Sequence, residues 1–163
     1  MNSNSPGVDS QTLSVKRAEV EFHNFASLGE PGVIVHGLRV KPGKPTVLAA
    51  AGGKPVIGLP GNPTSALMIL EAVAAPVIAA LTGAELPRAF LTARLGTPAR
   101  ARAGWTWYVP VALQNDGATP AAHPLPLRSS SVSLPARAGG YIVVEGDGAE
   151  MPAGTLVTVF RFL

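Results

Sequence analysis

The sequence predicts an α/β segment followed by a small all-β, barrel-like domain. Short β-branched segments lead into one long apolar helix that starts after residue 62. Beyond residue 86, short apolar runs alternate with Gly, Pro, Asn and Asp turns, a pattern typical of small barrels and sandwiches. With 47% hydrophobic and 14% charged residues in 163, the chain has the composition of a globular protein rather than a disordered one.

The α/β segment is predicted to hold a first helix, three strands and a second helix. An imperfect helical repeat of apolar residues spans 17–28 and is ended by Gly29 and Pro31. Three β-branched or apolar stretches, separated by Pro and Gly punctuation, are the expected strands: 33–40, 46–49 and 55–59.

The second helix is predicted to begin at Pro63 and to be buried on more than one side. Asn62 suits its N-cap, Pro63 its first position, and Gly83 its C-cap. Pro76 is expected to kink the helix, because its ring clashes with the carbonyl one turn earlier. The stretch is long and apolar enough to resemble a membrane span, but Glu71 and Pro76 interrupt it and it begins with a cap typical of globular proteins. We therefore interpret it as a core helix.

A domain boundary is predicted near 84–88, which gives domains at 1–84 and 85–163. Five apolar runs of the second domain are the expected strands: 90–95, 105–113, 131–134, 141–145 and 155–162. Asn115-Asp116-Gly117 and Asp147-Gly148 are typical of hairpin turns. Residues 1–16 are polar, and whether they are a native part of the domain, or ordered, is left open.

Composition also limits the possible functions. The absence of cysteine excludes disulfides and thiolate metal sites. The three histidines are too scattered for a zinc cluster or a Ser-His-Asp triad: His23, His36 and His123. Thirteen dispersed basic residues against ten acidic ones leave a net charge of only +3, which argues against nucleic acid as a partner. The polar first ten residues lack the apolar core of a signal peptide, so we expect a cytoplasmic protein that does not bind a membrane.

The turn from Pro60 to Pro63 is predicted to be the working site. Both prolines fix φ and lack an N–H, so the turn is stiff, and Gly61 allows a ligand to approach the backbone closely. The N–H groups of residues 64–66 are expected to point outward at the positive end of the helix dipole, where they would bind a phosphate or an oxyanion. An ordinary strand-to-helix turn is the alternative.

Three of the four lysines, Lys41, Lys44 and Lys54, precede this turn. Pro42-Gly43 stiffens the loop between the first two, so both ammonium groups are expected near one end of the sheet, where open α/β sheets bind ligands. Solvated turn lysines are the alternative. A serine-rich cluster at 128–133 offers hydroxyl groups, although a solvent-facing strand edge is the favoured interpretation there. Carboxylates are sparse and mostly in turns, so acid–base roles and a Mg²⁺ site are poorly supplied.

Two motifs in this order resemble signatures of the molybdopterin molybdenumtransferases, the MoeA and gephyrin E-domain family. Val40-Lys41-Pro42-Gly43-Lys44-Pro45 resembles the family's Lys-Pro-Gly-Lys-Pro motif. The stretch from Gly58 to Ala66 resembles its Leu-Pro-Gly-Asn-Pro-x-Ser-Ala motif. Weaker similarity continues through the helix and into the β-rich tail at Arg137 to Val144, so that the resemblance covers residues 28–163.

The resemblance implies the last step of molybdenum cofactor synthesis, in which molybdate is inserted into adenylylated molybdopterin and AMP is released with the help of Mg²⁺. It implies that residues 1–84 are part of a molybdopterin-binding α/β domain. A partner is expected as well, either a second copy in a homodimer, because the helix after Pro63 is apolar on more than its core side, or a complementing N-terminal polypeptide. The family pocket is carried over as catalytic Lys41, Pro60 and Pro63 and ligand-binding Lys44, Gly61, Asn62 and Ser65, with no residue assigned as a metal ligand.

The sequence also departs from the family pattern. Family members begin with two further domains. Their Gly-Gly-x-Ser-x-Gly-x-x-Asp loop is replaced here by residues 11–19, which keep Ser14, place Glu19 at the acidic position and lack all three glycines. The stretch from Gly104 to Val111 lacks the family's strand arginine. We therefore expect this chain alone to be incomplete as an enzyme. A fragment, a split subunit, a shortened paralogue and a non-catalytic binding or scaffolding module remain alternatives, as does a general phosphate-binding protein.

Overall fold

The computed structural model describes residues 27–127, 134–146, 148 and 150–162. These residues form two compact units, the first made of residues 27–36 and 47–58 and the second of residues 37–46 and 59–162, within the described ranges. The first predicted helix, except for its last two residues, and the serine-rich cluster at 128–133 lie outside the described residues. The domain division at 84 and 85 stays a prediction.

The first unit is a three-stranded antiparallel sheet in the order β1-β3-β4. Its strands are β1 (Pro31–His36), β3 (Val47–Ala51) and β4 (Lys54–Gly58). Gly52 and Gly53 join β3 to β4 with φ values of 56° and 75°, the left-handed backbone that a tight hairpin needs. All described pairings in this unit are antiparallel, so the ligand-binding rule for the ends of parallel strands does not apply to it.

The strand expected over 33–40 is divided between the two units. Gly37, with φ of 86°, takes the chain out of the β region after β1. The short strand β2 (Val40–Lys41) then pairs in parallel with β7 (Thr106–Gln114), which sets Lys41 opposite Trp107. This pairing between distant parts of the sequence brings the lysine motif to the C-terminal part of the chain.

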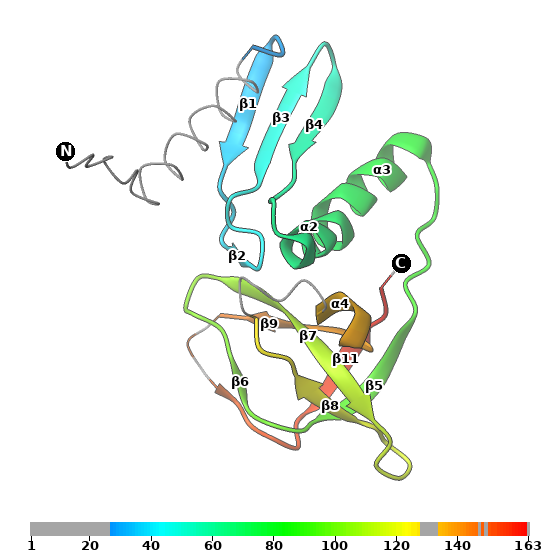
Figure 1. Ribbon diagram of the computed structural model, residues 1–163. Helices are drawn as coiled ribbons and strands as arrows, with labels where there is room; N and C mark the ends of the chain where they lie inside the picture. The colour runs from blue at the N-terminus through cyan, green and yellow to red at the C-terminus, as the bar shows by residue number, and fades with distance from the viewer. Residues whose placement is uncertain (1–26, 128–133, 147, 149, 163) are drawn as a thin grey trace, which may run out of the picture. The chain divides into compact units, whose positions relative to one another are not determined.

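The second unit contains a closed barrel of five strands (Figure 1). Its members are β5 (Phe90–Leu95), β7, β8 (Ala121–Pro124), β9 (Gly140–Glu145) and β11 (Leu156–Phe160). The order is β7-β8-β5-β11-β9, and β9 pairs again with β7 to close the ring. Within this ring only β5 and β8 run parallel. A separate ribbon pairs β6 (Ala99–Arg100) with β10 (Glu150–Met151).

Four of the five apolar runs predicted as strands are strands, and the fifth, at 131–134, lies outside the described residues except for its last residue. That residue, Leu134, begins the short helix α4 (Leu134–Arg137). Strands β6, β8 and β10 were not predicted, because they are two to four residues long and carry little β-branched pattern. Their extended conformation is stabilised by hydrogen bonds to the strands with which they pair.

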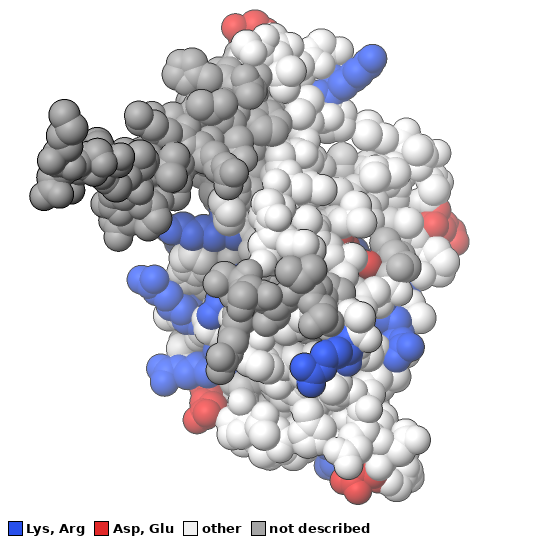
Figure 2. All heavy atoms as spheres, in the orientation of Figure 1, with Lys and Arg blue, Asp and Glu red and all other residues white. Residues whose placement is uncertain are grey.

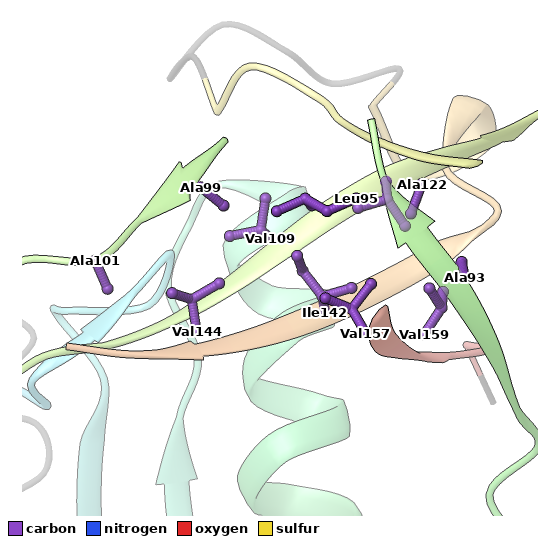
Figure 3. Close-up of a cluster of buried hydrophobic side chains, with 11 residues drawn as sticks. Ala93, Leu95, Ala99, Ala101, Val109, Ala122, Ile142, Val144, Val157 and Val159 are labelled. Atoms are coloured by element: carbon purple, nitrogen blue, oxygen red, sulfur yellow. The ribbon is translucent and has the colours of Figure 1, made fainter. Parts of the chain in front are cut away.

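The barrel interior is filled by small and branched apolar side chains (Figure 3). They occupy alternate strand positions, since successive residues of a strand point to opposite faces. Those from β5, β7, β9 and β11 are Ala93, Leu95, Val109, Val111, Ile142, Val144, Val157 and Val159. Because each fully buried Val, Leu or Ile contributes about 1.5–3 kcal/mol, this cluster is a main source of the unit's stability.

The second helix consists of α2 (Pro63–Ile69), a π turn η1 (Leu70–Ala74) and α3 (Ala75–Thr82). Gly83 ends it in the left-handed conformation, with φ of 68°, as predicted. The helix accommodates Pro76 through the π turn that precedes it, in which the Ala75 N–H donates to the Leu70 carbonyl five residues back. Sequence reasoning predicted only a kink at this proline.

Length and composition alone would allow residues 63–82 to span a membrane, a test that core helices also pass. The contacts within the second unit identify a packed helix. Met68, Ile69 and Glu71 are buried on it, and Arg88, in the segment that leads to β5, donates a hydrogen bond to the Glu71 carbonyl. Leu70, Ile78 and Leu81 remain exposed. The apolar surface of the helix is therefore only partly buried among the described residues.

Arg88 also lies near two tyrosines of the barrel. Burial raises the pKa of Tyr141, while the Arg88 charge lowers it and the Glu71 charge raises it. Burial likewise raises the pKa of Tyr108, with Arg88 again opposing. Tyr141 stacks on Phe160 at 5.6 Å between ring centroids, and its hydroxyl is buried without a hydrogen-bond partner among the described residues. The segment between the helix and the barrel thus places one half-buried cation beside aromatic side chains.

Candidate functional site

The loop that carries the Lys-Pro-Gly-Lys-Pro motif is closed by its own hydrogen bonds. The Gly37 N–H donates to the Thr46 carbonyl and the Leu38 N–H to the Lys44 carbonyl, both at 2.9 Å. The buried Thr46 donates twice to the Gly43 carbonyl, from its N–H at 3.1 Å and from its hydroxyl at 2.7 Å. These bonds hold the loop in one conformation, so Lys41 projects from a fixed backbone.

Gly43 is the point at which this loop contacts helix α2. Its φ is 123°, and a Cβ built there would lie 2.5 Å from Ile69 Cδ1 and 2.7 Å from Ile69 Cγ1. Ile69 is fully buried. Only glycine provides both the backbone conformation and the space, which explains the glycine of the first motif. The contact joins the first motif to the helix that begins within the second motif, although the sequence separates them.

The Pro-Gly-Asn-Pro turn forms the predicted helix cap. Asn62 has φ of −79° and ψ of 127°, and its side-chain oxygen accepts from the Ser65 N–H at 3.1 Å and from the Ser65 hydroxyl at 3.4 Å. The Ala66 N–H donates to the Asn62 carbonyl at 2.9 Å. The expectation that the N–H groups of residues 64–66 all point outward to an anion is therefore wrong, because the cap uses those of Ser65 and Ala66.

Both motifs line one small pocket of the second unit, which we call the motif pocket. It has a volume of about 150 Å³ and is lined by Lys41, Pro42, Asn62, Thr64, Ser65, Leu127 and Leu134. The structure thus brings together Lys41, Asn62 and Ser65 of the residues singled out from the sequence. Thr64 was considered only for its N–H, and Leu127 and Leu134 were missed, because no local pattern marks residues that reach a pocket from another part of the fold.

The other predicted site residues are outside this lining. Pro60 is buried under the turn that it stiffens, whereas Gly61, Pro63 and Lys44 are exposed. Lys54 lies at the start of β4 in the first unit. Among the predicted cations, Lys41 is therefore the one that the structure places in the pocket, and the prolines act on the shape of the turn.

Lys41 also contacts an aromatic ring that the sequence analysis did not assign to the site. Its Nζ lies 3.9 Å from the centroid of Trp107, a cation–π contact that the β2–β7 pairing positions. Among the described residues, neither a carboxylate nor a histidine lines the motif pocket. On the face drawn in Figure 2, the Lys and Arg side chains are separated by uncharged surface rather than joined in a stripe. The site is thus one positive charge in a wall made of three uncharged polar residues and three apolar ones.

The described residues do not fit the Mg²⁺ ion that the family resemblance implies. No group of three or more His, Asp or Glu side chains that could hold a metal occurs among them. Glu19, the residue at the family's acidic position, lies outside the described residues. Because Mg²⁺ prefers carboxylate and carbonyl oxygens and Lys41 occupies this pocket, we derive no step through the ion.

The motif loop, the capped helix and the barrel lie in one compact unit, and they define a mixed α/β protein with a C-terminal barrel. Residues 14–80 match the family model of a probable molybdopterin binding domain, and residues 92–162 match the MoeA C-terminal region (domain IV). The chain belongs to the MoeA family of molybdenum cofactor biosynthesis and corresponds to its C-terminal portion.

Solved structures agree with this assignment. The chain is 32% identical to a molybdopterin biosynthesis MoeA protein from Pyrococcus horikosii, with a TM-score of 0.69 over 93% of this chain and 34% of that one. A MoeA protein from Pyrococcus horikoshii OT3 (17% identity, TM-score 0.69, 94% and 40% covered) shows the same fold. So does a molybdenum cofactor biosynthesis protein from Pyrococcus furiosus (20%, 0.64, 94% and 55%). The comparison with curated proteins found no match. The chain spans about a third of the first of these structures.

Proposed function

We propose that this chain binds molybdopterin or its adenylylated form at the motif pocket, and that it contributes to the insertion of molybdate with release of AMP. The observation that carries the proposal is the convergence of Lys41, Asn62 and Ser65 on one pocket from two separate motifs. Membership in a molybdenum cofactor biosynthesis family supports the ligand class.

The chemistry of the lining supports an anionic ligand. Lys41 supplies a positive charge whose position is restrained by the closed loop and by the Trp107 ring. Ser65 offers a hydroxyl that can donate to a phosphate or molybdate oxygen in place of its long, 3.4 Å bond to the Asn62 side-chain oxygen. Asn62 has a different role, because its side-chain oxygen is already used to cap the helix. In this proposal Lys41 binds the anion, and Asn62 with Pro60 and Pro63 holds the turn that positions Ser65.

The proposed role is that of one part of a larger site. Lys44 and Gly61 lie outside the pocket lining in this chain, and we propose that they contact the ligand from a completed assembly. The alternative is a non-catalytic molybdopterin-binding or scaffolding module. The absence of a glycine loop at residues 11–19 favours that alternative, since the backbone of such a loop approaches phosphate closely. A cytoplasmic location and a homo-oligomer belong to the same proposal.

Replacement of Lys41 tests the binding site. A charge-assisted hydrogen bond is worth about 1.5–3 kcal/mol, so Lys41→Ala should weaken molybdopterin binding about 10- to 150-fold at low salt. Lys54→Ala is the matched control, because it removes the same charge from the first unit and leaves the pocket lining intact. Equal dissociation constants for the wild type and Lys41→Ala, within twofold, would remove Lys41 from the site.

A turnover assay distinguishes an enzyme from a non-catalytic binding or scaffolding module. Purified chain is mixed with adenylylated molybdopterin, molybdate and Mg²⁺, and AMP is measured with time. We expect binding without AMP release, and release only after a polypeptide carrying the remaining family domains is added. AMP release at roughly tens of turnovers per hour by the chain alone, which is still slow against typical kcat values, would contradict the proposal that the site is incomplete.

A further inference from the structure

A second and larger cavity lies in the same unit and shares Lys41 with the motif pocket. Its volume is about 300 Å³, at the lower end of the range for small-molecule sites. We call it the Trp107 cavity. It is lined by Lys41, Pro98, Ala99, Arg100, Trp107, Val109, Pro124, Leu125, Pro126 and Leu127. Neither family motif extends into it beyond Lys41, and the proposed function does not use it.

The wall of this cavity combines flat apolar surface with two positive charges. One indole ring, three prolines and four aliphatic side chains contribute most of the lining. Lys41 and Arg100 supply the charges, and in the part of the chain that the structure describes neither a carboxylate nor a histidine lines the cavity. Such a wall complements a ligand that has a planar ring and an anionic group. A purely apolar ligand would leave both cations unpaired, and a purely anionic one would leave the indole and the prolines unused.

Lys41 and Leu127 line both the Trp107 cavity and the motif pocket. An anion at Lys41 can therefore be reached from either side by one extended ligand. The ammonium group is held 3.9 Å above the Trp107 ring, and this restraint reduces the entropy that it would lose on binding. The geometry places a phosphate site between two compartments, one polar at the helix cap and one aromatic at the barrel.

We infer that the Trp107 cavity binds the nitrogen-heteroaromatic end of the ligand, with the ring against Trp107 and its phosphate between Lys41 and Arg100. The identity of the ligand rests on the proposed function, while the ring-plus-phosphate chemistry rests on the cavity itself. A pterin and an adenine share that chemistry, since each is a flat nitrogen heterocycle linked to phosphate. Arg100 and Trp107 are then specificity-determining residues for the ring end.

Intrinsic fluorescence provides a direct test, because the chain has two tryptophans. In a Trp105→Phe background, which leaves the cavity lining unchanged, Trp107 is the remaining indole. The probes are AMP, 6-hydroxymethylpterin monophosphate, adenosine and inorganic phosphate. We expect AMP or the pterin phosphate to quench Trp107 and to bind at least about tenfold more tightly than adenosine or inorganic phosphate alone, since ring and anion each contribute. The tighter of the two ring phosphates identifies the end of the ligand that occupies the cavity.

Variants locate the binding. Loss of aromatic stacking in Trp107→Leu should weaken the preferred probe about 5- to 100-fold, whereas Trp107→Phe should retain most of the affinity. Ligand binding to the two Trp107 variants is measured by isothermal titration calorimetry, since these variants lack the fluorescent indole. Arg100→Gln, at an exposed position, should weaken the ring phosphates about tenfold and leave adenosine unchanged. Melting temperatures check folding, and Arg100→Gln keeps the test decisive if Trp107→Leu does not fold.

Three results would overturn the inference: no ring phosphate binds at millimolar concentration, inorganic phosphate binds as tightly as the best ring phosphate, or Arg100→Gln and the Trp107 variants bind like the wild type. Failure of the inference is separable from failure of the proposed function. If molybdopterin binding depends on Lys41 but is indifferent to Trp107 and Arg100, the motif pocket stands and the Trp107 cavity is not a compartment of the site.

Discussion

Replacing Gly43 by alanine should destabilise the second unit through two separable terms. The φ of 123° costs a non-glycine residue about 1–3 kcal/mol. The added Cβ would lie 2.5 Å from Ile69 Cδ1, and overpacking of this kind costs about 1–3 kcal/mol more. The expected loss is therefore about 2–6 kcal/mol, a large part of the 5–15 kcal/mol by which domains are stable. Urea unfolding followed by circular dichroism measures it.

Two other glycines of the chain isolate the terms. Gly29 has φ of 117° with nothing within 4 Å of its Cβ position, so Gly29→Ala should show the backbone term alone, about 1–3 kcal/mol. Gly61 has neither a strained φ nor a neighbour within 4 Å, so Gly61→Ala should be neutral to slightly stabilising. If Gly43→Ala costs no more than Gly29→Ala, the packing term is absent.

A double-mutant cycle tests the contact with Ile69. Ile69→Val removes the atom closest to the added Cβ and should cost about 0.5–1.5 kcal/mol by itself. In that background Gly43→Ala should cost less, with a coupling of about 0.5–3 kcal/mol. Additivity within about 0.3 kcal/mol would refute the explanation that the glycine is required by the approach of helix α2.

Three further predictions concern the helix and the barrel. First, Ile78 and Leu81 are 53% and 64% exposed on an apolar helix, so the chain should self-associate at roughly tens of micromolar. Leu81→Glu should weaken this self-association. Sedimentation of the wild type as a clean monomer at that concentration would contradict the prediction. Second, the pKa of Tyr141 is raised, so the unfolded state ionises first and stability should fall as the pH rises above about 10. Arg88→Met should raise this pKa further in a spectrophotometric titration, and a lower pKa would show that the guanidinium does not act on the phenol. Third, Gly146→Ala would place a Cβ against backbone carbonyl oxygens and should cost at least about 3 kcal/mol, whereas an unchanged unfolding midpoint would show that this turn can move.

The sequence by itself determined the local elements and the two motifs. Asn62 caps its helix and Gly83 ends it, because these effects depend on neighbouring residues. Four barrel strands follow from alternation and turn residues, which are also local signals. The motifs named the family without the structure, since their residue order is specific.

Only the tertiary structure decided how these parts meet. Pairing of β2 with β7 sets Lys41 against Trp107, and packing of Ile69 on Gly43 joins the loop to the helix. These contacts link residues 26 to 66 positions apart in sequence, so no local pattern reports them. The expectation that the first N–H groups of the helix are free to bind an anion was wrong. In the structure Asn62 accepts hydrogen bonds from two of these groups, those of Ser65 and Ala66. Which residues line the site depends on contacts between distant parts of the chain, and these contacts form only when the barrel closes and the helix packs.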